Sequence, residues 1–326
     1  MAQPSNLFDR YDNANSVRED LANVIYNISP EDTPFMSTIG RGSANQTYFE
    51  WQTDALAAAS TTNAVIEGDE ATLSALTATN RVGNYTQISR KVIGVSGTNE
   101  AVDKAGKKSE MAYQMAKASA ELKRDMETAL LYNQAAVVGD GSTARQTAGL
   151  PAWLRTNVNK AAGGSNPTLS STNNGYPNAA RTDGTQRSFT ETILKDVIQQ
   201  VWTQGGDPKI CMMGPANKKV ASSFVGIAAN RMNYPGNKAA AFTVVATVDV
   251  YLSDFGQVTF VANRFQRDRE AFILDPEYAR VDYLRNFQTK DLAVTGDSIK
   301  KMLIVEYGLR VMTEKAHGIA ADLTTP

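Results

Sequence analysis

The side chains that could carry out nucleophilic or metal-assisted chemistry are scarce in this sequence of 326 residues. It contains one histidine, His317, and one cysteine, Cys211. One residue of each kind cannot form the histidine and cysteine cluster that holds zinc, and it leaves few ways to build a Ser-His-Asp or Cys-His site. Cys211 stands in the apolar run at 210–213, which favours a small buried hydrophobe. We interpret His317 as a turn or interface residue rather than a general base.

Motifs for phosphate binding and for acid–base catalysis are also missing from the sequence. The glycine-rich stretch at 139–143 lacks the lysine and the spacing of a P-loop. Pairs of carboxylates among 34 acidic residues carry almost no information about general acid–base catalysis. Glu67, Asp69 and Glu70 lack the calcium-loop pattern, so we interpret them first as a solvated tip and second as an intersubunit ion-pair site. We therefore predict no catalytic, cofactor or metal site, and no enzyme.

Composition and charge exclude further classes of protein. Lys and Arg total 33 and Asp and Glu total 34, so the net charge of −1 argues against dedicated DNA binding, although a container can enclose DNA without gripping it. The first residues have neither the basic nor the apolar region of a signal peptide. No apolar run approaches the ~20 residues of a membrane span, so no membrane is expected as a partner.

The N-terminal third is predicted to form an arm and a ribbon, which are stable only when they pack on another surface. Residues 1–40 are predicted to form an arm with a short helix at 16–27, stopped by Pro30 and Pro34. Strands are predicted at 46–54 and 81–96, joined by a stretch rich in Ala, Thr and Ser. The result is a long two-stranded ribbon, which is only marginally stable by itself in water.

A long helix is predicted at 109–136. Ser109 is a suitable N-cap, and Met111, Met115, Leu122 and Met126 follow helical spacing on one face. At 1.5 Å per residue such a helix is ~40 Å long. The opposite face is charged and includes Lys123, Arg124 and Glu127, which predicts a solvated face or one that meets neighbouring subunits.

The remainder of the chain divides into three stretches. Residues 139–189 are poor in large apolar side chains and are predicted to form an exposed excursion pinned by Trp153. A compact α/β stretch follows, in which a capping box at 188–191 opens a helix that ends at Gly205. Further elements are predicted there and at the end of the chain: strands at 210–213, 243–252, 257–263, 271–274, 278–285 and 299–312, and a helix near 215–225.

The arm, the ribbon and the helix carry apolar faces that they cannot bury alone, which predicts a building block of a large closed assembly. Their order along the chain resembles the major capsid protein of tailed bacteriophages, the Hong Kong 97-type fold. The matching stretches lie at 27–35 (NISPEDTPF), 49–54 (FEWQTD), 121–127 (ELKRDME), 253–256 (SDFG), 295–297 (TGD) and 314–318 (EKAHG).

The resemblance implies an α+β fold with named parts. These are an N-terminal arm (1–40), an extended loop (41–98), a peripheral domain with a spine helix (99–138 and 276–326), the excursion (139–189) and an axial domain (190–275). It implies self-assembly as hexamers and pentamers into an icosahedral head around double-stranded DNA, in the host bacterial cytoplasm. The implied partners are a portal protein at one vertex, a separate scaffolding protein and a possible cement protein.

The resemblance also suggests which residues meet a neighbouring subunit. The candidates for intersubunit contact are Phe49, Trp51, Glu67, Asp69, Glu70, Lys123 and Arg124. For Trp51, packing within its own subunit is an equal alternative. Residues 55–80 contain no lysine, so we predict no covalent crosslink of the kind that some members of the fold form through a loop lysine. Two alternatives stay open here: the shell of an encapsulin-like nanocompartment, and an α+β hydrolase.

Overall fold

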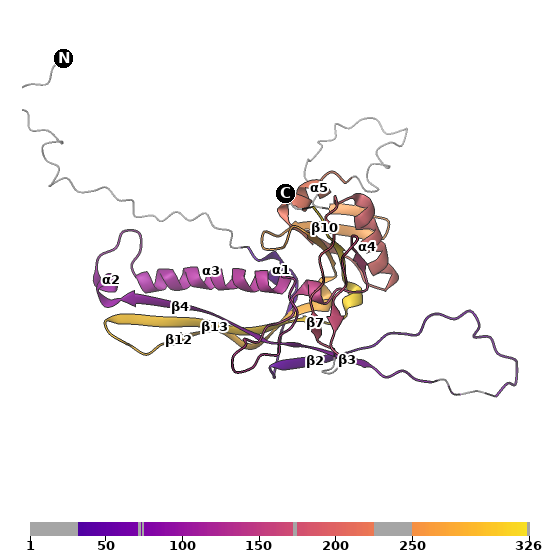
Figure 1. Cartoon of the computed structure of the whole chain (residues 1–326), viewed down its shortest axis with the longest axis horizontal. Helices are drawn as coiled ribbons and strands as arrows, with labels where there is room; N and C mark the ends of the chain where they lie inside the picture. The colour runs from indigo at the N-terminus through magenta and orange to yellow at the C-terminus, as the bar shows by residue number, and fades with distance from the viewer. Residues whose placement is uncertain (1–31, 71–72, 74, 172–174, 225–249, 325–326) are drawn as a thin grey trace, which may run out of the picture.

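The chain is described by a computed structural model that places residues 32–70, 73, 75–171, 175–224 and 250–324. Helices and strands form two regions, which confirms the predicted α+β class. A long helix, α3, lies along an elongated four-stranded sheet, and a compact region with a six-stranded sheet sits over one end of it (Figure 1). A long loop projects from that same end, away from the free end of α3 (Figure 1).

Helix α3 spans Glu110–Leu131 and runs the length of the elongated region. It begins where predicted, because the Ser109 hydroxyl accepts a hydrogen bond from the backbone N–H of Ala112 at 3.1 Å. It ends before the predicted end at residue 136. The Asn133 side chain there exchanges two hydrogen bonds with the backbone of Arg181, at 2.8 and 3.2 Å, and this pairing directs the chain out of the helix.

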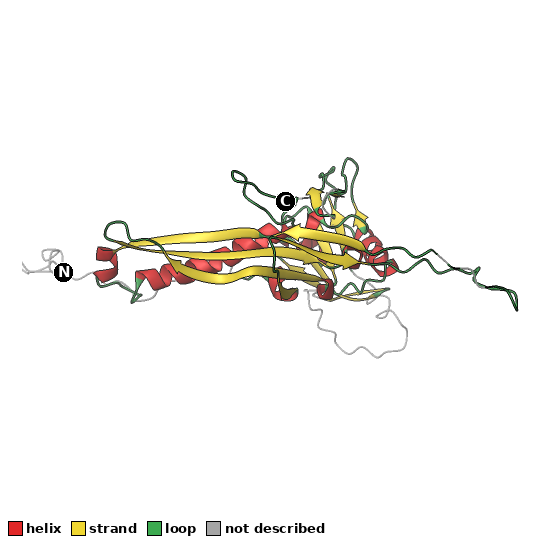
Figure 2. Ribbon diagram, turned by 90° about the horizontal axis from the view of Figure 1, so that it is seen from below, coloured by secondary structure: helices red, strands yellow, loops and turns green. Residues whose placement is uncertain are grey.

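The four-stranded sheet has the order β1-β12-β13-β4, with β1 parallel to β12 and the other pairs antiparallel. Helix α3 covers one face of this sheet (Figure 2) and is held to β4 by an ion pair between Lys91 Nζ and Asp125 Oδ2 at 2.8 Å. The predicted strand at 81–96 is interrupted at Thr86 and divides into two. The two pieces are β3 (Asn80–Tyr85), which lies outside this sheet, and β4 (Gln87–Ser96). The other strands of the four-stranded sheet are β1 (Gly40–Ser43), β12 (Ala279–Asp291) and β13 (Ser298–Val311).

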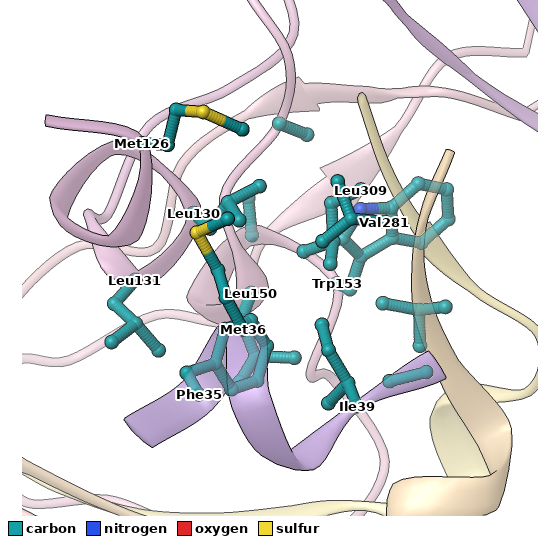
Figure 3. Packing of buried hydrophobic residues seen from close by; sticks show 14 of the residues in the cluster. Phe35, Met36, Ile39, Met126, Leu130, Leu131, Leu150, Trp153, Val281 and Leu309 are labelled. Carbon is teal, nitrogen blue, oxygen red and sulfur yellow. The ribbon is translucent and has the colours of Figure 1, made fainter. Parts of the chain in front are cut away.

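The last residues of the predicted arm belong to the core of the chain itself. Residues 1–31, including the predicted helix at 16–27, lie outside the described residues. A short helix, α1 (Pro34–Thr38), follows, and Pro34 opens it instead of only breaking the preceding segment. Figure 3 shows Phe35, Met36 and Ile39 packed beside Met126, Leu130 and Leu131 of α3. This end of the arm therefore packs on the spine helix of its own subunit.

The six-stranded sheet of the compact region has the order β5-β14-β11-β8-β10-β9. Two of its strands come from outside 190–275, namely β5 (Val158–Asn159) and β14 (Gly318–Ala321). The other strands are β8 (Ile210–Met213), β9 (Val250–Ser253), β10 (Gly256–Ala262) and β11 (Glu270–Leu274). Most of the predicted strand at 243–252 lies outside the described residues, which resume at Val250.

Two helices pack on this sheet. Helix α4 spans Glu191–Thr203, and its N-cap is Thr190 rather than the predicted Ser188, because the Thr190 hydroxyl accepts from the backbone N–H of Ile193 at 3.4 Å. The glycine predicted to stop it, Gly205, follows its C-cap residue Gln204 and has φ of +91°. Helix α5 (Pro215–Ala221) is shorter than the predicted helix near 215–225.

The excursion predicted at 139–189 is pinned by Trp153, as predicted, and the buried anchor includes the residues beside it. The 3₁₀ turn η1 (Leu150–Ala152) and the following Trp153 and Leu154 are at most 3% exposed and belong to the same core as α1 and α3. A short hairpin of β6 (Thr168–Leu169) and β7 (Pro177–Ala179) lies beyond it. The few apolar residues of this segment are concentrated in one turn, and that turn is buried.

Replacing Trp153 by alanine should lower the free energy of unfolding of the subunit by about 3–5 kcal/mol. Trp153 is 3% exposed, and its ring lies 5.3 Å from that of Trp51, so the change leaves a cavity beneath the ribbon. Urea denaturation followed by circular dichroism measures the loss. Trp202→Ala is the matched control and should cost less than about 1.5 kcal/mol, because that side chain is 55% exposed. Equal losses in the two variants would contradict this account of the core.

Candidate functional site

The ribbon is fixed at its root on the body of its own subunit. Strands β2 (Tyr48–Thr53) and β3 pair antiparallel. Phe49 is 5% exposed and lies under the Arg310 guanidinium, 5.4 Å from it, and Trp51 contacts the same guanidinium at 5.3 Å. Gly308 makes this packing possible, because a Cβ there would collide with the Phe49 ring. Phe49 and Trp51 thus pack locally, and their contact with a neighbour stays a prediction.

The loop between β2 and β3 presents apolar side chains to solvent. Leu56, Val65, Ile66, Leu73 and Leu76 are between 80% and 102% exposed. The loop that carries them extends away from the body (Figure 1). Exposed large apolar residues gathered on one segment are typical of a surface that another chain covers.

The predicted acidic tip is a hydrogen-bonded turn. The Asp69 N–H donates to the Ile66 carbonyl oxygen at 3.0 Å, and Gly68 supplies the positive φ of +86° that the turn needs. Glu67 lies within this turn and Glu70 follows it, and both are exposed, as is Asp69. Within the described part of the chain, none of the three carboxylates forms an ion pair. The turn therefore presents three uncompensated negative charges.

Lys123 and Arg124, the two predicted contact residues on α3, have different surroundings. Lys123 is exposed and lines an open groove of about 760 Å³ together with Arg41 and Tyr283. The Arg124 guanidinium lies over the Phe265 ring at 5.6 Å and links α3 to the compact region. Of the two, Lys123 is the one that is available to a neighbouring chain.

The structure corrects the prediction that Glu127 lies on the charged face of α3. Glu127 is fully buried, and its oxygens accept hydrogen bonds from the backbone N–H groups of Phe35 at 2.7 Å and Met36 at 2.9 Å. The Asn263 side-chain amide donates a third at 2.7 Å. Burial raises the pKa of Glu127, and these three donors oppose that rise. The spacing of four from Leu131 is the signal that places Glu127 beside the apolar face.

A second buried charge cluster joins the excursion to the compact region. Glu270, at the start of β11, is 1% exposed, and Arg181, in the excursion, is 3% exposed. Burial raises the pKa of the Glu270 carboxyl to about 7, although the Arg267 and Arg181 guanidinium groups oppose it. Desolvation lowers the pKa of Arg181. Asp322, whose φ is +60°, also joins the two parts, because its carboxylate accepts a hydrogen bond from the Ala161 N–H at 3.0 Å.

The one cysteine and the one histidine of the sequence are both buried. Cys211 is fully buried, as predicted, and burial raises its pKa to about 12. His317 follows the 3₁₀ turn η3 (Glu314–Ala316), in keeping with the turn alternative, and it is fully buried. Burial lowers its pKa to about 4. Among the residues that the structure places, no three His, Cys, Asp or Glu side chains gather as a metal site. Over the same residues, no helix is long and apolar enough to cross a membrane.

Comparison with known proteins identifies the family. Residues 3–324 match the family described as SU10 major capsid protein. The chain belongs to this family. The major capsid protein of Escherichia phage Phieco32 is 32% identical over 354 residues, covering 98% of this chain and 97% of that relative. The predicted resemblance is confirmed: the chain is a major capsid protein that forms a phage head, is part of the virion, and is not an enzyme.

Solved structures agree on the Hong Kong 97-type fold. The Cyanophage A-1(L) capsid asymmetric unit matches with a TM-score of 0.64 at 13% identity, over 95% of this chain and 98% of that one. The holo-SrpI encapsulin complex of Synechococcus elongatus matches with a TM-score of 0.53 at 11% identity, over 97% of this chain and 96% of that one. Phage capsids and encapsulins share the fold, so family membership decides in favour of the phage head.

Glu127→Ala should lower the free energy of unfolding of the capsid subunit by about 3 kcal/mol or more, because it leaves three buried donors without an acceptor. Urea denaturation of the unassembled subunit measures the change. Glu121→Ala on the same helix is the control. Glu121 forms only surface ion pairs, at 3.8 Å to Lys91 and 4.0 Å to Lys117, and its loss should cost less than about 1 kcal/mol. A Glu127 variant as stable as the control would refute the assignment.

Glu270 should make the stability of the subunit fall as pH rises from about 4.5 to about 7. Its pKa is raised from 4.5 to about 7, so the folded chain binds a proton more readily than the unfolded chain in this window. His317 acts in the opposite direction, because its lowered pKa favours the folded state as pH rises from about 4 to 6.5. The quantity to compare is therefore the melting temperature of wild type and of Glu270→Gln, measured by thermal unfolding at a series of pH values. Melting temperatures that differ by the same amount at every pH would contradict the prediction.

Proposed function

We propose that this capsid protein assembles as hexamers and pentamers into an icosahedral head around double-stranded DNA, in the cytoplasm of the bacterial host. The observation that carries the proposal is the loop, which holds five exposed apolar side chains and three unpaired carboxylates away from its own body. Full burial of one such apolar side chain contributes about 1.5–3 kcal/mol. A neighbouring copy that covers the loop supplies this burial.

The contact is of a kind that closes rings. The loop lies on one part of the subunit and the surface that receives it lies on another, so each copy both gives and receives a loop. Such head-to-tail contacts generate a ring when the rotation between copies closes. Many modest contacts repeated around a ring add up to a stable assembly. Glu67, Asp69 and Glu70 pair with cations of the neighbour in this proposal. Lys123 lies on the receiving side, and Arg124 supports α3 there through its contact with Phe265.

The other partners follow from the family resemblance and from charge. A portal protein occupies one vertex, a separate scaffolding protein acts during assembly, and a cement protein binds outside. Because residues 150–154 of the excursion are buried, a cement protein would be limited to its exposed parts, such as residues 140–144. The net charge of −1 supports a wall that encloses DNA without holding it through sequence-specific contacts.

Reversing the three tip charges tests this function. The variant Glu67→Lys/Asp69→Lys/Glu70→Lys should lower the yield of particles at least ~10-fold while the circular dichroism and melting of the subunit stay unchanged, because the side chains are exposed. Particles are counted by sedimentation and negative-stain microscopy after expression with the other head genes of the same phage. Asp207→Lys, at a side chain 71% exposed in the compact region, is the control and should assemble normally.

Two results would go against the proposal. Normal particle yield from the triple variant would remove the tip from the interface. Wild-type chains that never form rings or shells under the same conditions would contradict self-assembly itself.

A further inference from the structure

Irregularities of three neighbouring strands fall at the same level of the elongated sheet. Strand β12 shifts register twice against β13, between Tyr283 and Arg285 and again between Arg285 and Gln288. Each shift gives β12 one residue more than β13, and such bulges bend a strand and increase its twist. The residue of β13 opposite Arg285 is Glu306, which also pairs with the second residue of β4. The break between β3 and β4 at Thr86 lies just before that residue, so the sheet is irregular along one line.

A buried carboxylate holds the chain together on this line. Glu306 is 3% exposed, and its two oxygens bind groups from three other segments. Oε1 accepts from the Thr86 hydroxyl at 2.9 Å and from the guanidinium of Arg145, which belongs to the excursion. Oε2 accepts from Arg285 Nε at 2.7 Å. Arg145 Nε also donates to the Thr86 carbonyl oxygen at 2.7 Å, so these four residues form one closed cluster, which we call the Glu306 clamp.

The clamp joins the ribbon to the far part of the sheet. Thr86 is the corner at which the chain passes from the ribbon into β4, and its N–H donates to the Thr47 carbonyl oxygen at 2.8 Å. Arg285 stands between the two register shifts of β12. Beyond the clamp the sheet runs to the turn between β12 and β13, at the end opposite the ribbon (Figure 1). Charge-assisted hydrogen bonds are strong and directional, so the clamp fixes the angle between the ribbon and this distal part.

We propose that Glu306 is a positioning residue that sets the curvature of the head. It does so by fixing the angle at which the ribbon leaves the sheet. In the proposed assembly each copy gives one loop and receives another, so an angle within the subunit is repeated at every contact around the ring. A small change in this angle therefore changes the size at which the shell closes. This inference rests on the proposed function and adds the residue that controls the geometry of assembly.

The diameter of the particles tests this role. Arg285→Gln and Glu306→Gln should each lower the share of particles with the wild-type diameter at least ~5-fold, because each removes a charged partner from the clamp. Smaller, larger or unclosed shells take their place. The Arg285 side chain is 37% exposed, so its variant is the milder one and is the deciding variant if Glu306→Gln yields no folded subunit. Diameters are measured by negative-stain microscopy of particles expressed with the other head genes of the same phage.

Two controls separate geometry from stability. Val305→Ala removes a fully buried side chain beside Glu306, on the opposite face of β13, so it should lower the yield and leave the diameter unchanged. Asp291→Asn removes a surface ion pair with Lys301 at 3.2 Å in the same hairpin, and its particles should match wild type in number and size. Wild-type diameters in Arg285→Gln, or a changed diameter in Val305→Ala, would overturn the proposal.

The angle can also be measured in the unassembled subunit. Spin labels are attached at Gln52→Cys in the ribbon and Ala293→Cys in the distal turn, both exposed positions, while the native Cys211 is fully buried. The distribution of distances between the labels should be at least ~2-fold broader in Arg285→Gln than in wild type, because a directional hydrogen bond is lost. Asp291→Asn should leave it unchanged. Equal widths overturn the clamp while wild-type particles still support the shell, and wild-type chains that never assemble overturn the proposed function instead.

Discussion

The arrangement of the subunit depends on one buried negative charge, the carboxylate of Glu127. It has no cationic partner among the described residues, and its charge is balanced by three N–H donors from two other parts of the chain. Two donors are the first backbone amides of α1, and the third is Asn263, which follows β10. A buried charge held in this way is costly to disturb. The end of the arm, the spine helix and the compact region therefore keep a fixed relation to each other.

A neutral hydrogen-bond cluster does the same for the root of the loop. The Asn84 side chain is fully buried and donates to the Leu309 carbonyl oxygen at 2.7 Å, while its oxygen accepts from the Ala148 N–H at 3.0 Å. Thr147 accepts from the Leu309 N–H at 3.1 Å. Strand β3, the excursion and β13 are joined here by hydrogen bonds between buried polar groups that water does not reach. The loop thus leaves a rigid base, and every described residue from 54 to 80 is exposed.

Periodic parts of this fold could be predicted from the sequence, and contacts between distant parts could not. Helix α3 and the long strands follow from regular spacing of apolar residues, which local sequence records. The burial of Leu150–Ala152 depends on α3 and β13, and no spacing within the excursion reveals it. The burial of Glu127 likewise depends on distant parts of the chain, since its hydrogen-bond donors come from α1 and Asn263. The acidic tip was visible in sequence, but Arg41 and Lys123 meet only in the folded chain.

The contrast between a rigid root and an exposed tip bears on how errors are removed during shell growth. Contacts of three surface carboxylates and a few apolar side chains are weak when taken singly, so a subunit added in the wrong place can dissociate before its neighbours lock it. In the proposed assembly, a subunit whose loop is covered by one neighbour and which covers the loop of another is held from two sides. In the proposed assembly, the same loop therefore allows early dissociation of a misplaced subunit and late retention of a correctly placed one.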